Sequence, residues 1–470
     1  MNATSETTPK HTLEPENKMG VMLVNKLLLS MSIPMIISML VQALYNIVDS
    51  VWVSYIDQNA LSAVGLAFPI QNLMLSFAIG TGVGINALLS KSLGERNTKL
   101  VNQAAGNGIF VELVGALIFM LSSLFITRMF FEVQTDIPVI IDYGCDYLFI
   151  CLIACFPLFG QVTFERLLVS TGKTFYSMIT QAFGAILNIV LDPLMIFGVG
   201  PFPEMGIKGA AIATVTAQLC AMILAIFFNI KFNKEIDFTS LKNFRPSLGT
   251  IKRIYAVGLP SIIMTSISSV MTFGLNKILL SFTDTAVAAF NIYFKLQSFV
   301  FMPVFGLNNG MVPIIAYNYG AKKPGRLVKT IKLSIVYAVC IMVLGMLILQ
   351  IFPTQLLNIF KANEELISVG VPMLKIISLH FLFAGFCIVV GSVFQALENS
   401  LLSMGISLCR QIFVLLPVAY LLSFTGSLNN VWYSFLIAEL CSFTLSVCGM
   451  LWVYRKKIKP LNNTTSDIPA

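Results

Sequence analysis

A small set of ionisable residues lies within the long apolar segments of this 470-residue chain. A charge near the centre of a bilayer costs at least about 2.5–3.5 kcal/mol by insertion scales, so each charge in a membrane-spanning segment needs a structural or functional reason. The carboxylates in the set would bind cations or carry protons. The set comprises Asp49, Glu112, Asp142, Asp146, Glu165, Asp192, Lys277, Lys295, Lys375, His380, Glu398, Arg410 and Glu439.

Asp192 is the most informative of these residues, because polar side chains share its helix face. Asn188 precedes Asp192 by four residues, and Gln181 precedes Asn188 by seven, which places all three on one side of a helix. On the next predicted helix, Thr214 and Gln218 are four residues apart and would add a hydroxyl and an amide. The pattern predicts an oxygen-rich corner between two helices.

Asp49 ends a similar polar stripe. Gln42, Tyr45 and Asn46 lie seven, four and three residues before it, on one helix face. Carboxylate, amide and hydroxyl oxygens are the hard ligands that Na⁺ or a proton relay uses, so the two stripes together predict a cation site. The alternative is that both aspartates only hydrogen-bond neighbouring helices, or that Asp49 lies at a water interface.

The remaining charged residues are less informative. Glu112 lies between glycines at helical spacing, which favours close helix packing as much as ion handling. Glu165 and Arg166 adjoin a basic loop, so we expect them to extend toward it or to pair locally. We expect the same of Glu398 and Arg410 in the other half of the chain. The three lysines within apolar segments are equally compatible with helix ends and with a cleft.

Motifs for other kinds of chemistry are incomplete. Residues 170–174 resemble the end of a phosphate-binding loop, but Leu167 occupies the place of its first glycine and no strand precedes it. The two histidines, His11 and His380, cannot build a histidine-based metal centre, and the nine cysteines lack paired spacing. The sequence therefore does not favour a membrane-embedded enzyme, and we expect no cofactor.

Composition places most of the chain in a bilayer. Hydrophobic residues make up 57% of the sequence and charged residues 11%, against about 25% charged residues in soluble proteins. Lysine and arginine cluster in alternate loops, which explains the net charge of +8 without a nucleic acid partner. By the positive-inside rule these loops and both termini are cytoplasmic, which requires an even number of spans.

The apolar windows between these loops predict an all-α integral membrane protein of about twelve transmembrane helices. No secretory signal peptide is visible in the first 26 residues. The predicted helices lie near 25–54, 60–90, 101–127, 137–170, 174–199, 206–230, 250–281, 284–318, 326–352, 366–399, 403–424 and 429–454.

An internal repeat divides these helices into two sets of six. Pro34 and Pro260 match at an offset of 226, as do Gln71 and Gln297 and a series of alanines and glycines. The predicted parts are a cytoplasmic tail (1–24), a first lobe (25–230), a linker (231–249), a second lobe (250–454) and a C-terminal tail (455–470). Because each lobe has an even number of helices, the repeats run parallel, as in some transporters.

These residues resemble the multidrug and toxic compound extrusion (MATE) family over nearly the whole chain, with DinF-like and MepA-like bacterial members the most similar. The resemblance rests on Pro34 after an isoleucine, Asn46 with Asp49, the loop with Gly94 and Glu95, and the segment from Asn188 to Asp192 and Pro193.

The resemblance implies two six-helix lobes in a V, antiport of H⁺ or Na⁺, and efflux of lipophilic, often cationic small molecules. It assigns cation coupling to Asp49, Asn188, Asp192 and Thr214. The NorM-like branch of the family uses acidic residues in the second lobe, where this chain offers Lys277, Lys375 and His380 instead. We expect the substrate cleft to include Gln42, Tyr45, Asn46, Gln71, Gln181 and Gln297.

Two other functions remain open at this point. A lipid-linked oligosaccharide flippase of the same superfamily would need a large basic cavity and additional helices. A membrane receptor or structural protein would leave the paired polar stripes unexplained. We therefore expect a monomeric transporter in the cell membrane, with small molecules and membrane lipid as its partners.

Overall fold

The computed structural model describes residues 16–239, 244–360 and 362–461, so His11 and parts of the predicted tails and linker lie outside the described residues. Within these ranges the chain is helical and forms no strand. The helices are α1 (Lys18–Val21), α2 (Val24–Ser54), α3 (Gln58–Gly94), α4 (Thr98–Gln134), α5 (Pro138–Ile153), α6 (Phe156–Ser170), α7 (Thr174–Ile196), α8 (Ile207–Phe232), α9 (Leu248–Leu280), α10 (Asp284–Gly320), α11 (Pro324–Ile351), α12 (Pro353–Asn358), α13 (Glu364–Ser378), α14 (Phe381–Ala396), α15 (Ser400–Leu408), a π-helical stretch (Cys409–Leu415), α16 (Leu416–Ser423), α17 (Leu428–Val453) and a second π-helical stretch (Tyr454–Ile458).

Two predicted spans are broken helices. In the described part of the chain ten helices are long and apolar enough to cross a bilayer, and the count reaches twelve when each bent pair is one span. The predicted helix 137–170 is α5 and α6, bent by 47°, and the predicted helix 366–399 is α13 and α14, bent by 51°. Pro157 follows the first break and cannot donate the helical hydrogen bond. At the second break, the His380 imidazole Nδ1 lies 2.6 Å from the Ile377 carbonyl oxygen.

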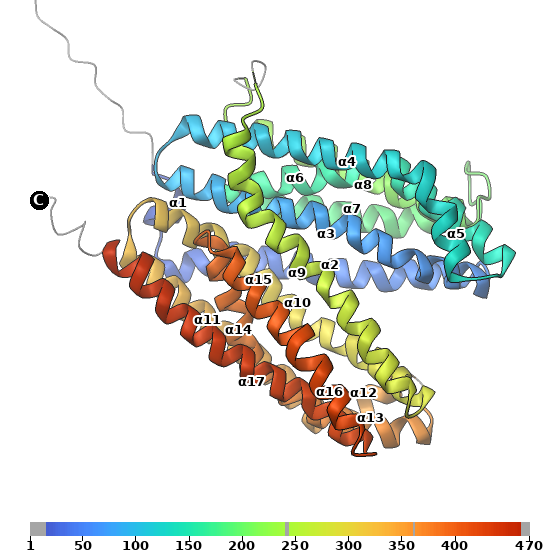
Figure 1. The fold of residues 1–470 in the computed structure, drawn as a ribbon. Coiled ribbons are helices and arrows are strands. Elements are labelled where there is room, and N and C mark those ends of the chain that lie inside the picture. The colour runs from blue at the N-terminus through green and yellow to red at the C-terminus, as the bar shows by residue number, and fades with distance from the viewer. Residues whose placement is uncertain (1–15, 240–243, 361, 462–470) are drawn as a thin grey trace, which may run out of the picture.

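The predicted repeat is visible in the helix boundaries. Helices α3 and α10 each have 37 residues, and both their ends differ by 226 positions. Pro34 and Pro260 lie buried at equivalent points inside α2 and α9. Figure 1 shows two helical bundles that lie together at the end containing α1 and diverge toward the opposite end. The predicted two-lobed, V-shaped architecture is confirmed.

Glycines allow the two lobes to meet closely. Helix α3 of the first lobe packs on α9 of the second, and α10 of the second lobe packs on α2 of the first. A Cβ atom on Gly84 would overlap the Ile254 carbonyl, and one on Gly310 would lie 2.6 Å from the Ser32 hydroxyl. These glycines are equivalent in the repeat, and each allows a helix of one lobe to approach a helix of the other closely.

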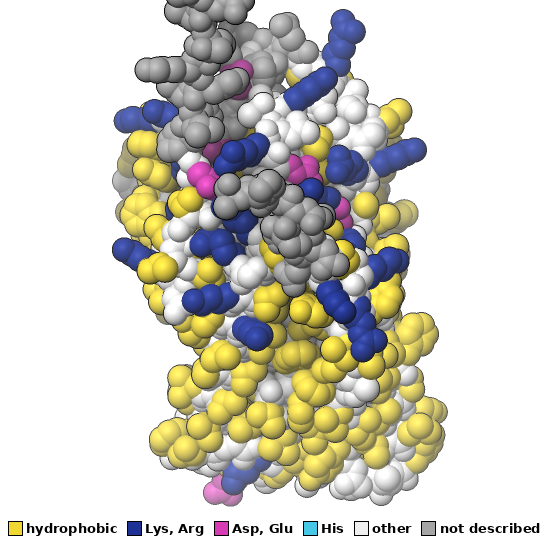
Figure 2. Space-filling view, turned by 90° about the vertical axis from the view of Figure 1, so that its left-hand side faces the viewer, with side chains coloured by type: hydrophobic (Ala, Val, Ile, Leu, Met, Phe, Trp, Pro, Cys, Tyr) yellow, Lys and Arg dark blue, Asp and Glu magenta, His cyan; other side chains and the backbone are white. Residues whose placement is uncertain are grey.

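The end where the lobes meet is strongly basic and is held by polar contacts. Figure 2 shows Lys and Arg side chains gathered on this end, while apolar side chains dominate the rest of the visible face. Lys91 of α3 pairs with Glu398, which follows α14, at 2.7 Å. The short helix α1 contacts both lobes, because Asn17 donates to the Thr171 carbonyl at 3.0 Å and Asn318 donates to the Met19 carbonyl at 3.1 Å.

Candidate functional site

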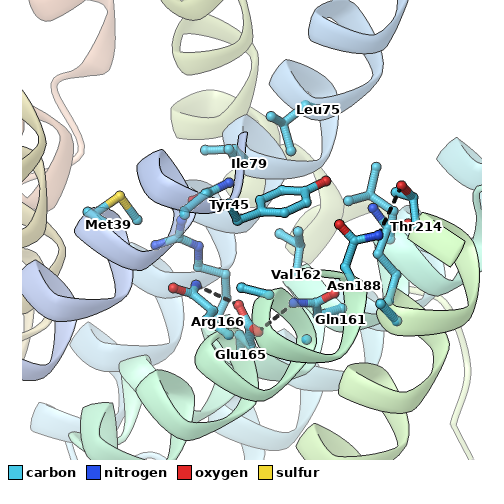
Figure 3. A pocket seen from close by; sticks show the side chains of 17 residues that line it. Met39, Tyr45, Leu75, Ile79, Gln161, Val162, Glu165, Arg166, Asn188 and Thr214 are labelled. Atoms are coloured by element: carbon cyan, nitrogen blue, oxygen red, sulfur yellow. Dashed lines mark hydrogen bonds between the residues drawn. The ribbon is translucent and has the colours of Figure 1, made fainter. Parts of the chain in front are cut away.

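Polar residues predicted from the sequence meet around one cavity in the first lobe, shown in Figure 3. Its volume is about 130 Å³, and its walls come from α2, α3, α6, α7 and α8. Helix α7 packs against both α2 and α8, which brings the two predicted stripes together. Six polar residues that the sequence placed near the two aspartates line the cavity: Gln42, Tyr45, Gln181, Asn188, Thr214 and Gln218.

Asp49 and Asp192 form a carboxyl pair next to this cavity. Their carboxyl groups are within hydrogen-bonding reach of each other, although they lie on α2 and α7. Asp192 is fully buried. Asn188 donates to Asp192 Oδ1 at 3.0 Å. The Asn188 amide nitrogen also lies 3.4 Å from the Thr214 hydroxyl (Figure 3). Two carboxyl groups this close repel each other unless a proton or a cation lies between them.

Oxygens without a donor concentrate at this pair. Asp49 Oδ1, Asp192 Oδ2 and Asn188 Oδ1 are buried, and none has a hydrogen-bond partner among the described residues. An unsatisfied buried acceptor costs roughly 1–3 kcal/mol. The side chain of Tyr45 reaches the Thr214 hydroxyl on the opposite wall. The arrangement therefore provides carboxylate, amide and hydroxyl oxygens for a proton or a hard cation.

Three other residues expected in the substrate cleft do not line this cavity. Asn46 is exposed on α2. Gln71 donates to the Tyr147 hydroxyl at 3.3 Å and lies 3.7 Å from the Cys151 sulfur, so it connects α3 to α5. Gln297 is half-buried on α10, in the other lobe. Of the six residues expected in the substrate cleft, Gln42, Tyr45 and Gln181 therefore meet at this cavity, whereas Asn46, Gln71 and Gln297 do not.

The expectation for Glu165 and Arg166 was wrong. Their exposures are 5% and 7%, so neither side chain extends to the loop. Both line the cavity, where Gln161 and Gln181 donate to the Glu165 carboxylate at 3.0 and 2.7 Å (Figure 3). Arg166 donates across the lobe interface to Asn309 Oδ1 at 3.0 Å. Gln161, four residues before Glu165, is the signal in the sequence that would have indicated a polar helix face.

The other ionisable residues have varied surroundings. Both carboxylate oxygens of Glu112 are buried without a hydrogen-bond partner among the described residues. Arg410 pairs with buried Glu439 at 3.0 Å, and Glu398 pairs with the other lobe, so local pairing was the wrong expectation for this second pair. The intramembrane lysines are exposed: Lys277, Lys295 and Lys375. In the described residues no group of three or more His, Cys, Asp or Glu side chains could hold a metal ion.

Comparison with known proteins identifies the family. The MatE family model matches this chain twice, over residues 34–194 and 260–421. The chain belongs to the MatE family. The two matches are the two repeats, and this family consists of transporters rather than enzymes. The structural and sequence evidence together make the protein a multi-pass membrane transporter.

Similar proteins cover almost the whole chain. The FAD transporter of Shewanella oneidensis is 25% identical over 448 residues, which is 94% of this chain and 97% of that protein. The multidrug export protein MepA of Staphylococcus haemolyticus is 26% identical over 420 residues, 89% of this chain and 91% of that protein, so the MepA-like resemblance is confirmed. An outward-facing multidrug resistance MATE transporter has the same fold, with a TM-score of 0.88, 23% identity, and coverage of 96% and 99% of the two chains.

Proposed function

We propose that this protein is a secondary multidrug efflux transporter that exchanges H⁺ or Na⁺ for lipophilic, often cationic small molecules by alternating access. The observation that carries the proposal is the group of unpartnered buried oxygens on Asp49, Asp192 and Asn188. A proton or a cation would satisfy these oxygens and remove the repulsion between the carboxyl groups. The MepA relatives, named as multidrug export proteins, support the substrate class.

The energy available to such an exchange is sufficient. One charge that crosses a potential of 100 mV releases about 2.3 kcal/mol. A tenfold concentration gradient of substrate requires about 1.4 kcal/mol. A single coupling cation would therefore sustain more than a tenfold gradient of an uncharged substrate, and no cofactor is required for this step.

The proposed orientation follows from charge. The end with α1, Lys91 and the basic loops would face the cytoplasm, and the diverging ends of the lobes would face outward. In this state Asp49 and Asp192 would exchange ions with the outside. We propose a monomer in the plasma membrane. The flippase alternative finds little support, because the cavity is small and its one arginine is accompanied by a carboxylate.

The test measures efflux of a cationic dye from proteoliposomes with Na⁺ and pH gradients imposed separately. The variants are Asp192→Asn and, as a matched control, Asp142→Asn, which makes the same chemical change at an exposed carboxylate on α5. We expect one gradient to drive efflux, Asp192→Asn to abolish it, and the control to resemble the wild type. Gradient-driven efflux that survives Asp192→Asn would remove this residue from coupling, and a wild type that exports no dye under either gradient would refute multidrug efflux.

A further inference from the structure

The cavity is lined by a buried carboxylate that does not belong to the Asp49–Asp192 pair. Glu165 is 5% exposed and lies on α6, whereas Asp49 and Asp192 belong to α2 and α7. Among the described residues, none of the ion pairs includes Glu165. Its neighbour Arg166 directs a guanidinium nitrogen to Asn309 in the other lobe, at 3.0 Å. Glu165 therefore lines the cavity without a directly hydrogen-bonded cationic side chain, and Arg166 is the positive charge next to it.

The Glu165 carboxylate also retains the capacity to accept hydrogen bonds. An ionised carboxylate offers about four acceptor positions. Gln161 uses one position on Oε1 and Gln181 uses one on Oε2. The Thr180 hydroxyl lies 3.1 Å from Oε1, but its single hydrogen is shared with the Ser177 carbonyl at 2.7 Å. At least one acceptor position, on Oε2, remains for a ligand.

A second acceptor without a donor lies beside this carboxylate. Gln181 donates its amide nitrogen to Glu165, and its oxygen Oε1 is buried with no hydrogen-bond partner among the described residues. Both residues line the cavity. A ligand with two N–H groups on one nitrogen, such as a protonated amine, would donate to both of these oxygens. A quaternary ammonium or a phosphonium supplies the charge but donates no hydrogen bond.

We propose that Glu165 and Gln181 bind the protonated N–H amine of the organic substrate, a site separate from the cation-coupling pair. This inference rests on the proposed efflux function and adds its substrate class: lipophilic primary or secondary amines, in preference to quaternary cations. Tyr45 lines the same cavity and offers an aromatic face to the ammonium group. Apolar residues Leu75, Ile79 and Val162 surround the methylene groups next to the nitrogen.

The size of the cavity limits what it holds. A volume of about 130 Å³ is below the roughly 300–1,000 Å³ of pockets that enclose a whole drug-sized molecule. The cavity accommodates an amine head group with a few carbon atoms, so the remainder of the substrate must lie outside it. Selection for the amine is therefore strict, whereas selection for the rest of the molecule is broad.

The test compares two probes with one structural difference. Dansylcadaverine, a primary amine, and its N,N,N-trimethylammonium analogue are titrated by fluorescence against the purified full-length protein in lipid nanodiscs. We expect the wild type to bind the primary amine at least about tenfold more tightly, since charge-assisted hydrogen bonds distinguish the probes. Glu165→Gln should lose at least about tenfold in affinity for the primary amine and reduce the preference between probes. Equal wild-type affinities would overturn the proposal.

Two further variants keep the result interpretable. Glu132→Gln neutralises an exposed carboxylate at the end of α4 and should bind both probes as the wild type does. Gln181→Met removes the unpartnered oxygen together with the amide group that donates to Glu165, but it keeps the Glu165 side chain, so it should weaken amine binding even if Glu165→Gln fails to fold. Unchanged amine affinity in Gln181→Met, or in a folded Glu165→Gln protein, would overturn the assignment.

An efflux measurement separates this proposal from the proposed function. If the amine binds in a Glu165-dependent way but neither gradient drives its export, the amine site stands and the efflux function fails. If a gradient drives export of the primary amine equally in the wild type and in Glu165→Gln, efflux stands and the amine site is refuted.

Discussion

The contact between the lobes predicts a specific effect of adding one methyl group at Gly84. A Cβ atom there would overlap the Ile254 carbonyl of the other lobe, and its next neighbour, the Gly258 amide nitrogen, would be 3.1 Å away. Both neighbours are backbone atoms of α9, so the overlap cannot be relieved by a change of rotamer. Gly84→Ala should therefore force α3 and α9 apart and weaken closure at the basic end.

The magnitude follows from two opposing terms. Alanine is more favourable than glycine in a helix by about 1 kcal/mol, whether or not the lobes are closed. Overpacking of a close interface costs typically about 1–3 kcal/mol, and only the closed arrangement has this cost. The ratio of closed to open protein should fall by about 5-fold to 150-fold. Gly65→Ala is the matched control, because it lies on the same helix and a Cβ atom there meets no atom within 4 Å.

A zero-length crosslink measures closure directly. Lys91 and Glu398 belong to different lobes, and their charged groups are 2.7 Å apart in the closed arrangement. A carbodiimide joins such a pair only while the lobes are in contact, and mass spectrometry of the digested protein quantifies the product. We expect a reduced crosslinking rate in Gly84→Ala and a wild-type rate in Gly65→Ala. Equal rates in both variants would refute the steric argument.

Three further predictions concern other sites. Arg410→Met leaves the buried carboxylate of Glu439 without its partner and should destabilise the protein by about 3–5 kcal/mol. Thermal unfolding should show a lower Tm for this variant. A double variant that also changes Glu439 to Leu should recover most of the lost stability. Asn188→Leu removes the amide between Asp192 and Thr214 and should reduce ion-driven efflux at least about tenfold, while unchanged efflux would contradict its role in coupling. The hydrogen bond from Lys323 holds the pKa of Glu16 below its ordinary 4.5. The contact therefore stabilises the N-terminal segment fully when the pH is above 4.5, and this stabilisation is lost as the pH falls through the lowered pKa of Glu16. Hydrogen exchange of residues 17–22, corrected for the intrinsic rate, should show reduced protection in acid for the wild type, and already at pH 7 for Glu16→Gln.

The lobes, the repeat and the main polar stripes are predictable from the sequence because they depend on local spacing. Apolar length defines a span, and an offset of 226 residues relates α3 to α10. The spacing of four between Asn188 and Asp192 places both on one helix face in any packing. These features require no knowledge of which helices are neighbours.

Contacts between helices were decided by the tertiary structure alone. Glu165 and Arg166 lie within the last six residues of α6, close to a loop in the sequence, yet the packing of α6 against α8 and α3 encloses both side chains. Arg166 finds its partner Asn309 in the other lobe, 143 positions away. Asp49 meets Asp192 only because α2 packs on α7. Helix periodicity gives the direction of a side chain, whereas its partner and its access to water depend on which helix lies opposite.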